Sequence, residues 1–255
     1  RSTMGASAHT SISKPTVLRL TSASPRAKLE PPKPQVAPQI APISLDYVAL
    51  AEPAPISEQV GHYLPYRPSR IAIPDACPHP TPLVESVAMG SIASPVPVAR
   101  PMVSQSCIDH GLLSEAQLET LIYAVNAFER DLAGTYVPTD KGCSIEPSAD
   151  GKAYRCGYFL GDGTGAGKGR QLASIIMDRW LRGERRHIWL SKNEALLEDA
   201  RRDWSALGGL PLDVQPLSQW KLGSALGMSE GIVFVTYPTL RSGRVDANRL
   251  DQLLH

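Results

Sequence analysis

The stretch that decides the fold is Tyr158-Phe159-Leu160-Gly161-Asp162-Gly163-Thr164-Gly165-Ala166-Gly167-Lys168-Gly169-Arg170. Three apolar residues predict a strand, and glycine then occupies every second position from Gly161 to Gly169. Glycines tolerate positive φ and let successive backbone N–H groups approach an anion closely. Lys168 can reach the β- and γ-phosphates of a nucleotide. The pattern therefore predicts a phosphate-binding loop.

The residues after the loop predict a helix, because apolar side chains recur at helical spacing: Leu172, Ile175, Ile176 and Trp180. The dipole at the N-terminus of such a helix favours phosphates. Strand, loop and helix in this order are the context that a phosphate-binding loop requires. A tight strand-to-helix turn with an incidental lysine is the alternative interpretation.

Two positions depart from the common G-x-x-x-x-G-K-[ST] pattern. The first glycine of the pattern is replaced by Asp162, and the residue after the lysine is Gly169. The second departure matters more, because a Ser or Thr there normally binds Mg²⁺.

Composition indicates a soluble protein that is globular over part of its length. Apolar residues make up 42% of the 255 residues, charged residues make up 20%, and the net charge is +1. This charge gives no strong electrostatic case for nucleic acid. The arginines at 179, 182, 185 and 186 cluster after the predicted helix, and we interpret them as a solvated helix end.

The four cysteines, at 77, 107, 143 and 156, form no C-x-x-C pair, so we expect reduced thiols. No apolar run approaches the roughly 20 residues that cross a bilayer, and the start of the sequence has no signal-peptide pattern. We therefore expect a cytoplasmic protein without a membrane partner.

Prolines divide the chain into two parts. Residues 1–101 hold 18 of the 23 prolines, which prevents regular helix or sheet from propagating. We predict that 1–101 is a proline-rich linker or arm, mostly disordered and largely irregular, and that 102–255 is folded. Residues 43–51 and 83–89 are candidate docking segments; for the first we favour transient order.

Ahead of the loop, Ser114 and Gln117 form an S-x-x-Q capping box, and apolar residues recur on one face of the helix that it opens. Residues 134–151 read as a polar loop with a turn at 148–151.

After the loop, helices and strands alternate at α/β spacing. We predict strands at 187–191 (buried), 212–217 and 232–236, and a helix that opens with the capping box Ser191/Glu194 and ends at Gly208-Gly209. Such alternation predicts an α/β fold with a parallel sheet and a nucleotide at the carboxyl ends of its strands.

Four segments follow the motif order of the first motor domain of superfamily 2 helicases: Gln117, the loop at 161–170, residues 189–193 and residues 235–241. More closely, the chain resembles the Strawberry notch family, whose loop is similar to Gly-Asp-Gly-Thr-Gly-x-Gly-Lys-Gly-Arg. The resemblance extends over about 105–255 and more loosely over 79–89, and further similar segments lie at 196–209 and 231–241. It implies a RecA-like P-loop NTPase domain that binds ATP and Mg²⁺.

The resemblance also implies roles for single residues. The triphosphate would be bound by the loop, namely by Gly163, Thr164, Gly165, Ala166, Gly167, Lys168, Gly169 and Arg170, with Lys168 as the catalytic residue. Gln117 would read adenine, although a glutamine in a capping box already has a structural role. Gly169 matches the family, which indicates that Mg²⁺ is held by other groups or through water. Nucleic-acid backbone would be contacted by Ser191, Lys192, Thr236 and Arg241, where capping and turn roles are an equal alternative.

Phosphoryl transfer also needs an acidic pair on a later strand, and the chain contains no Asp-Glu dipeptide. We therefore expect 102–255 to be the N-terminal portion of a P-loop domain, truncated before the Walker B motif, that binds nucleotide without appreciable turnover. The resemblance implies that the full-length protein is an ATP hydrolase.

Three function classes follow. The first is a helicase-like or translocase-like ATPase that acts on nucleic acid, DNA rather than RNA, through the full-length protein. The second is a nucleotide-sensing interaction protein that binds a protein partner through its proline-rich arm. The third, a small phosphotransferase, would need an acceptor pocket and a lid, which the sequence does not indicate.

Overall fold

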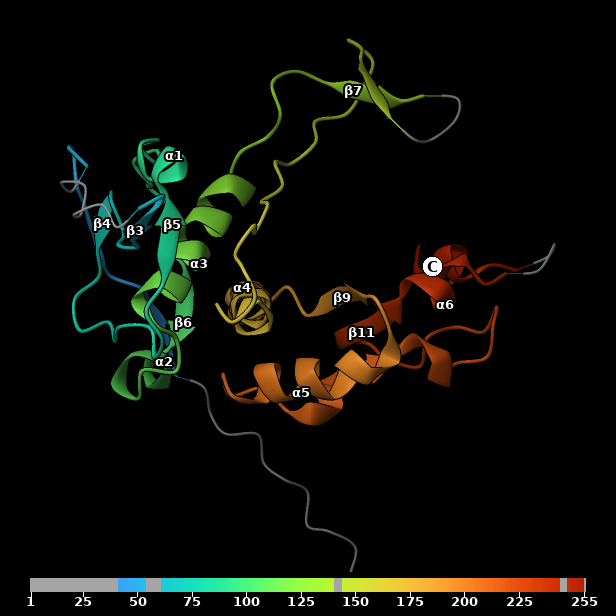
Figure 1. Ribbon diagram of the computed structural model, residues 1–255. Coiled ribbons are helices and arrows are strands. Elements are labelled where there is room, and N and C mark those ends of the chain that lie inside the picture. The colour runs from blue at the N-terminus through green and yellow to red at the C-terminus, as the bar shows by residue number, and fades with distance from the viewer. Residues whose placement is uncertain (1–40, 54–60, 140–143, 244–246, 255) are drawn as a thin grey trace, which may run out of the picture. The chain divides into compact units, whose positions relative to one another are not determined.

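The computed structural model describes residues 41–53, 61–139, 144–243 and 247–254 (Figure 1). All described residues belong to one compact unit. The part of the proline-rich arm before residue 41 therefore lies outside the described residues.

A three-stranded parallel sheet is formed by β9 (Arg186–Ser191), β10 (Val214–Pro216) and β11 (Gly231–Thr236), in the order β10-β11-β9. All six residues of β11 are buried, as its run of apolar β-branched and aromatic residues predicts. The predicted parallel sheet is confirmed, although it is small.

Two apolar clusters cover the two faces of β11. Ile232 and Phe234 belong to the main core, together with Met177 and Trp204. Val233 and Val235 point to the other face, where they pack against Leu217 in a second cluster, since successive side chains of a strand point to opposite faces.

The prediction that residues 187–191 are a buried strand is wrong in one respect. The strand β9 forms, but it lies at the edge of the sheet, and Ile188 and Leu190 are 50% and 46% exposed. Trp189, on the opposite face of β9, packs against the main core. An apolar run thus predicted the strand and not its position at an edge.

Three helices build the main core beside the sheet, with α4 (Lys168–Leu181) in contact with both α3 (Glu115–Phe128) and α5 (Leu197–Ser205). The Gln117 half of the predicted capping box forms at the start of α3, where Gln117 Oε1 accepts from Ser114 N at 3.0 Å, whereas Ser114 Oγ is buried without a hydrogen-bond partner among the described residues. The predicted helix forms as α4, in which Trp180 is buried but Leu172 is 42% exposed. The inward face of α4 instead includes small and polar side chains such as Ala173 and Ser174.

The predicted capping box of Ser191 and Glu194 does not form. Ser191 is the last residue of β9, and a 3-10 turn at Glu194–Leu196 separates it from α5. A residue that ends a strand cannot also cap a helix that begins six positions later. The predicted end of the helix holds more closely, since Gly208 has a φ of 104° shortly after α5.

The strand that we predict before the loop is also absent. Residues 156–163 carry no helix or strand, and Phe159 is 90% exposed. A strand needs a neighbour to pair its backbone N–H and C=O groups, and no described strand pairs with this segment.

Residues 41–101 differ from the expected linker. They contain one helical turn, α1 (Val87–Gly90), and two antiparallel pairs: β2 (Val48–Ala49) with β4 (Ile71–Ala72), and β3 (Tyr63–Pro65) with β5 (Val84–Ser86). A further strand, β1 (Pro42–Ser44), pairs antiparallel with β6 (Met102–Ser104), which lies just after residue 101. Leu45, Tyr47, Ile71 and Ile73 are buried in the main core. Prolines keep these strands short, but the apolar residues between them still pack.

The two candidate docking segments have different outcomes. In residues 43–51, Leu45 and Tyr47 are buried, so this segment packs into the core. In residues 83–89, Val84 and Met89 are 61% and 63% exposed.

The predicted polar loop contains a hairpin, formed by β7 (Tyr136–Pro138) and β8 (Ile145–Pro147). Its expected turn is present, because Gly151 N donates to Ser148 O at 3.1 Å. Figure 1 shows long extended segments that join the hairpin to α3 and α4. The remaining helices are α2 (Gln105–Asp109), α6 (Tyr237–Arg241) and α7 (Arg249–Leu254). Among the described helices, none has the length and apolar character to cross a bilayer.

Candidate functional site

The glycine-rich loop turns into α4 through left-handed backbone. Gly165 and Gly167 have φ of 98° and 75°, and Gly167 is the N-cap of α4. Residues other than glycine rarely adopt such positive φ values. Atoms added at the Cβ positions of Gly163 and Gly165 would meet nothing within 4 Å, so the loop faces open space on this side.

Lys168 folds back onto its own loop. Its Nζ donates to Asp162 O and Gly163 O, both at 2.9 Å. The ammonium group thus lies against the turn that would surround a phosphate. Thr164 is exposed within this turn, and Ala166 is buried.

Gln117, on α3, hydrogen-bonds the loop. Its Oε1 accepts from Ser114 N at 3.0 Å and its Nε2 donates to Ala166 O at 3.2 Å. The side chain is buried, and an ideal Cβ on Gly167 would lie 2.4 Å from its Nε2. The structure therefore brings the predicted Gln117 to the predicted loop, with both ends of its amide hydrogen-bonded.

Gln171 is a second side chain that hydrogen-bonds the loop, and the sequence analysis did not identify it. Its Nε2 donates to Ala166 O at 2.9 Å and to Asp162 Oδ2 at 3.0 Å. Its position one helical turn after Gly167 was the signal that could have found it, since side chains in the first turn of such a helix face the loop.

A second missed residue, Asp203 on α5, lies against Gly169. An ideal Cβ on Gly169 would lie 2.2 Å from Asp203 Oδ2. The next residue, Arg170, places its Nε 3.6 Å from Asp203 Oδ1 and donates from its guanidinium to Leu112 O at 3.1 Å. Arg170 thus ties the start of α4 to the segment before α3.

A buried carboxyl group, Glu119, lies on α3 two residues after Gln117. Tyr66 Oη donates a hydrogen bond to Glu119 Oε2. Burial, helped by the neighbouring carboxylates of Glu115, Glu85 and Asp162, raises the pKa of Glu119 to about 7 against the opposing hydrogen bond from Tyr66. Burial also raises the pKa of Tyr66 far above its usual range. The pair joins the segment after β3 to α3.

Ser191 and Thr236 are register partners at the carboxyl ends of β9 and β11. The structure brings these two of the four predicted backbone contacts together. Thr236 also caps α6, since its Oγ1 accepts from Thr239 N at 3.3 Å. Arg241 lies in the last turn of α6.

The arginine cluster at the end of α4 is largely solvated, as predicted, since Arg182, Arg185 and Arg186 are exposed and only Arg179 is half-buried. Asp178, which is fully buried, accepts from Arg179, from Arg182 and from the backbone N–H of Met102. Arg185 lies over the Trp180 ring, 4.7 Å from its centroid. Asp178 therefore fastens α4 to β6. Of the cysteines, 77, 107 and 156 are free thiols, and Cys143 lies outside the described residues.

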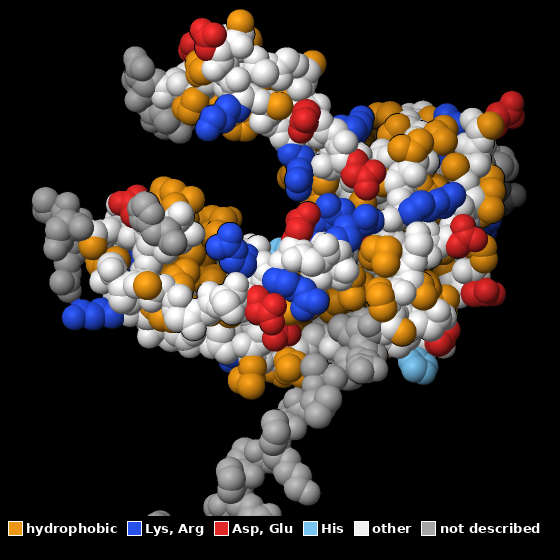
Figure 2. Space-filling model, turned by 180° about the vertical axis from the view of Figure 1, so that it is seen from behind, with side chains coloured by type: hydrophobic (Ala, Val, Ile, Leu, Met, Phe, Trp, Pro, Cys, Tyr) orange, Lys and Arg blue, Asp and Glu red, His pale blue; other side chains and the backbone are white. Residues whose placement is uncertain are grey.

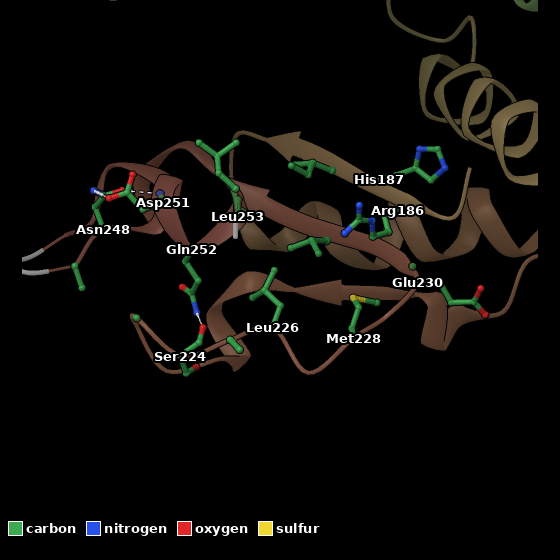
Figure 3. Close-up of a pocket in the computed structure, with 17 residues that line it drawn as sticks. Arg186, His187, Ser224, Leu226, Met228, Glu230, Asn248, Asp251, Gln252 and Leu253 are labelled. Atoms are coloured by element: carbon green, nitrogen blue, oxygen red, sulfur yellow. Dashed lines mark hydrogen bonds between the residues drawn. The ribbon is translucent and has the colours of Figure 1, made fainter. Parts of the chain in front are cut away.

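A cavity of about 720 Å³ lies away from the loop (Figure 3). Its lining includes Arg186 and Gly231, the first residues of β9 and β11, so it lies at the amino ends of these strands. Leu226 and Met228 line it, and Gln252 Nε2 closes one side by donating to Ser224 O at 2.7 Å. Ligands of open α/β sheets bind at the carboxyl ends, so this cavity is not the expected nucleotide site.

Figure 2 shows hydrophobic, basic and acidic side chains side by side on one face of the molecule. No uniformly basic surface covers this face, which agrees with the net charge of +1. No three His, Cys, Asp or Glu side chains of the described residues gather into a metal site.

Comparison with known proteins matches residues 78–255 to a family described as P-loop containing NTP hydrolase pore-1. Protein FORGETTER 1 of Arabidopsis thaliana is 34% identical over 197 residues, which are 75% of this chain and 14% of that protein. Protein strawberry notch homolog 1 is 33% identical over 209 residues in Gallus gallus and 32% over 210 in Homo sapiens, covering 77% and 78% of this chain. The chain spans 14 to 15% of the length of these relatives. No solved structure matches it.

Proposed function

Because the chain belongs to the Strawberry notch family of P-loop NTP hydrolases, we propose that its loop at 161–170 binds the triphosphate of ATP. The observation that carries the proposal is the left-handed backbone at Gly165 and Gly167, directly before the N-terminus of α4. Backbone N–H groups in such a turn, together with the helix dipole, stabilise an anion.

Residues 163–170 each have a role in this proposal. The backbone of Gly163, Thr164, Gly165, Ala166 and Gly167 surrounds the phosphates, while Gly169 and Arg170 continue into α4. Lys168 exchanges the carbonyl oxygens of Asp162 and Gly163 for phosphate oxygens, because an ammonium group interacts more strongly with charged acceptors. Mg²⁺ accompanies the triphosphate, and it neutralises charge on the phosphate oxygens when it is bound.

Gln117 supports the loop, because its amide accepts from Ser114 N and donates to Ala166 O. Reading adenine is its second candidate role, which would use the amide N–H and the oxygen lone pair that these two hydrogen bonds leave unused. The structure favours the supporting role, since both of its hydrogen bonds are already formed. The Gln117→Ala variant should therefore weaken ATP and GTP binding by the same factor, whereas a selective loss of ATP binding would show that Gln117 reads the base.

The longer protein is proposed to be an ATP-driven enzyme that acts on nucleic acid, DNA rather than RNA. The family and the position of Ser191 and Thr236 at adjacent strand ends support this. Binding of the full-length protein to DNA should weaken steeply with salt, because phosphate contacts release counterions. An affinity that does not change with salt would favour a nucleotide-sensing interaction protein, which would bind a protein partner through the proline-rich arm.

Titration of a fluorescent ATP analogue tests the proposal for this chain. Binding should be lost in Lys168→Ala and retained in Lys152→Ala, since Lys152 lies in the hairpin segment and is exposed. Equal binding by the two variants would contradict the proposal.

Hydrolysis is tested separately. We propose that this chain binds nucleotide without appreciable turnover, so its phosphate release should not exceed that of Lys168→Ala. A higher rate would show that the chain holds a complete catalytic site.

A further inference from the structure

The backbone conformation of Gly169 does not explain why glycine occupies this position. It lies in the first turn of α4, and its φ is not positive, unlike those of Gly165 and Gly167. Glycine weakens a helix relative to most residues, so a helical glycine indicates a close neighbour. That neighbour is the carboxylate of Asp203, whose Oδ2 and Cγ lie 2.2 Å and 3.3 Å from an ideal Cβ on Gly169.

Asp203 thus fills the space of the side chain that P-loops usually carry after the lysine. In most P-loops this side chain is a Ser or Thr whose hydroxyl binds Mg²⁺. A carboxylate oxygen is a stronger ligand for this hard cation than a hydroxyl group. We propose that Asp203 supplies from α5 the Mg²⁺ ligand that Gly169 cannot supply from α4. The inference rests on the proposed function, because Mg²⁺ is taken to arrive with the triphosphate.

The surroundings of Asp203 leave one oxygen available. Arg170 Nε and Arg202 Nε lie 3.6 Å and 3.7 Å from Oδ1, which is too long for good hydrogen bonds. No described residue donates a hydrogen bond to Oδ2. The side chain is only 14% exposed, so it is held in place beside Gly169 in the first turn of α4.

The test measures the metal and the nucleotide separately. Nucleotide affinity is measured in EDTA with a fluorescent ATP analogue, and Mn²⁺ affinity of the nucleotide-saturated chain is measured by the loss of the free Mn²⁺ signal in electron paramagnetic resonance. Asp203→Asn should bind the nucleotide in EDTA as well as the unaltered chain. Its Mn²⁺ affinity should fall by about tenfold or more, since loss of even an outer partner of a metal ligand costs this much.

Asp199→Asn is the matched control. Asp199 lies one turn earlier on α5, is 47% exposed and pairs with Arg202, so its variant should keep the Mn²⁺ affinity. A double variant then tests whether a lost Mn²⁺ affinity reflects a lost metal ligand or a loss of structure. Asp203→Ala should lose Mn²⁺ affinity, and the double variant Gly169→Ser with Asp203→Ala should regain part of it, because the serine hydroxyl then has room.

The outcomes separate the two proposals. An Asp203→Asn variant with unaltered Mn²⁺ affinity overturns the assignment of Asp203 while nucleotide binding in EDTA stands. Absence of nucleotide binding in EDTA by the unaltered chain overturns the proposed function, and the inference falls with it.

Discussion

Two separate features prevent any residue other than glycine at position 167. Its φ is 75°, and an ideal Cβ would lie 2.4 Å from Gln117 Nε2. Gly163, four residues earlier, has neither feature. The two glycines look equivalent in the sequence and are not equivalent in the loop.

Replacing each glycine by alanine should therefore give different results. Gly167→Ala should lower the free energy of unfolding by about 1–2 kcal/mol for the left-handed conformation alone and abolish nucleotide binding, because Gln117 must move. Gly163→Ala should leave the unfolding free energy within about 0.5 kcal/mol of the original. Urea denaturation with a parallel nucleotide titration measures both, and equal losses in the two variants would contradict the role given to Gln117.

At the level of elements, one carboxylate fastens α4 to β6. Asp178 is fully buried and accepts from Met102 N at 2.7 Å and from two arginines. Asp178→Ala should lower the free energy of unfolding by about 3–5 kcal/mol, because buried donors and charges lose their partner.

Asp199→Ala on α5 is the control for Asp178→Ala, since its pair with Arg202 is exposed and such pairs contribute about 0–1 kcal/mol. Denaturation of both variants measures the difference. A small loss in Asp178→Ala would mean that α4 and β6 are held by apolar contacts alone.

The burial of Glu119 makes stability depend on pH, because it raises the pKa of this carboxyl group against the opposing hydrogen bond from Tyr66. The pKa of Glu119 is raised to about 7 in the folded chain, against about 4.3 for an unperturbed glutamate. The folded state therefore keeps a proton that the unfolded state has released, and this stability is complete below about pH 4.3 and lost as the pH rises through 7.

The unaltered chain should accordingly lose roughly 3 kcal/mol between pH 4 and pH 8 relative to Glu119→Gln. The amide of the variant can still accept from Tyr66 Oη and does not ionise. Denaturation at both pH values gives the comparison, and parallel pH profiles of the two proteins would show that Glu119 does not titrate in this range.

Features that depend on residues close together in the sequence were predicted better than features that depend on contacts between distant segments. The hydrogen bond from Ser114 N to Gln117 Oε1 and the apolar run of β11 depend on neighbours in the chain, and both were predicted correctly. The strand at Phe159 was not, because a strand requires a partner from elsewhere in the fold. Asp203 could not be predicted at all, since only the packing of α5 on α4 brings it to Gly169.

At the scale of the whole molecule, described residues before position 102 contribute side chains to the core. Leu45, Tyr47, Ile71 and Ile73 are all buried in it. Their removal should cost on the order of 6–12 kcal/mol, at about 1.5–3 kcal/mol for each large apolar side chain, which equals the whole stability of a typical domain.

A fragment of residues 102–255 should therefore show no cooperative thermal transition, whereas a fragment of residues 41–255 should retain one. Circular dichroism during heating distinguishes them. Cooperative melting of the shorter fragment would support the interpretation of residues 1–101 as a linker.

The exposed edge of the sheet has a practical consequence for anyone purifying the chain. β9 presents six residues without a described neighbour on one side, and Ile188 and Leu190 are half exposed there. The opposite edge, β10, is only three residues long and ends on Pro216, which discourages further pairing. Aggregation at high protein concentration should therefore begin at β9, and a lysine at position 188 or 190 is the simplest protection for a stored sample.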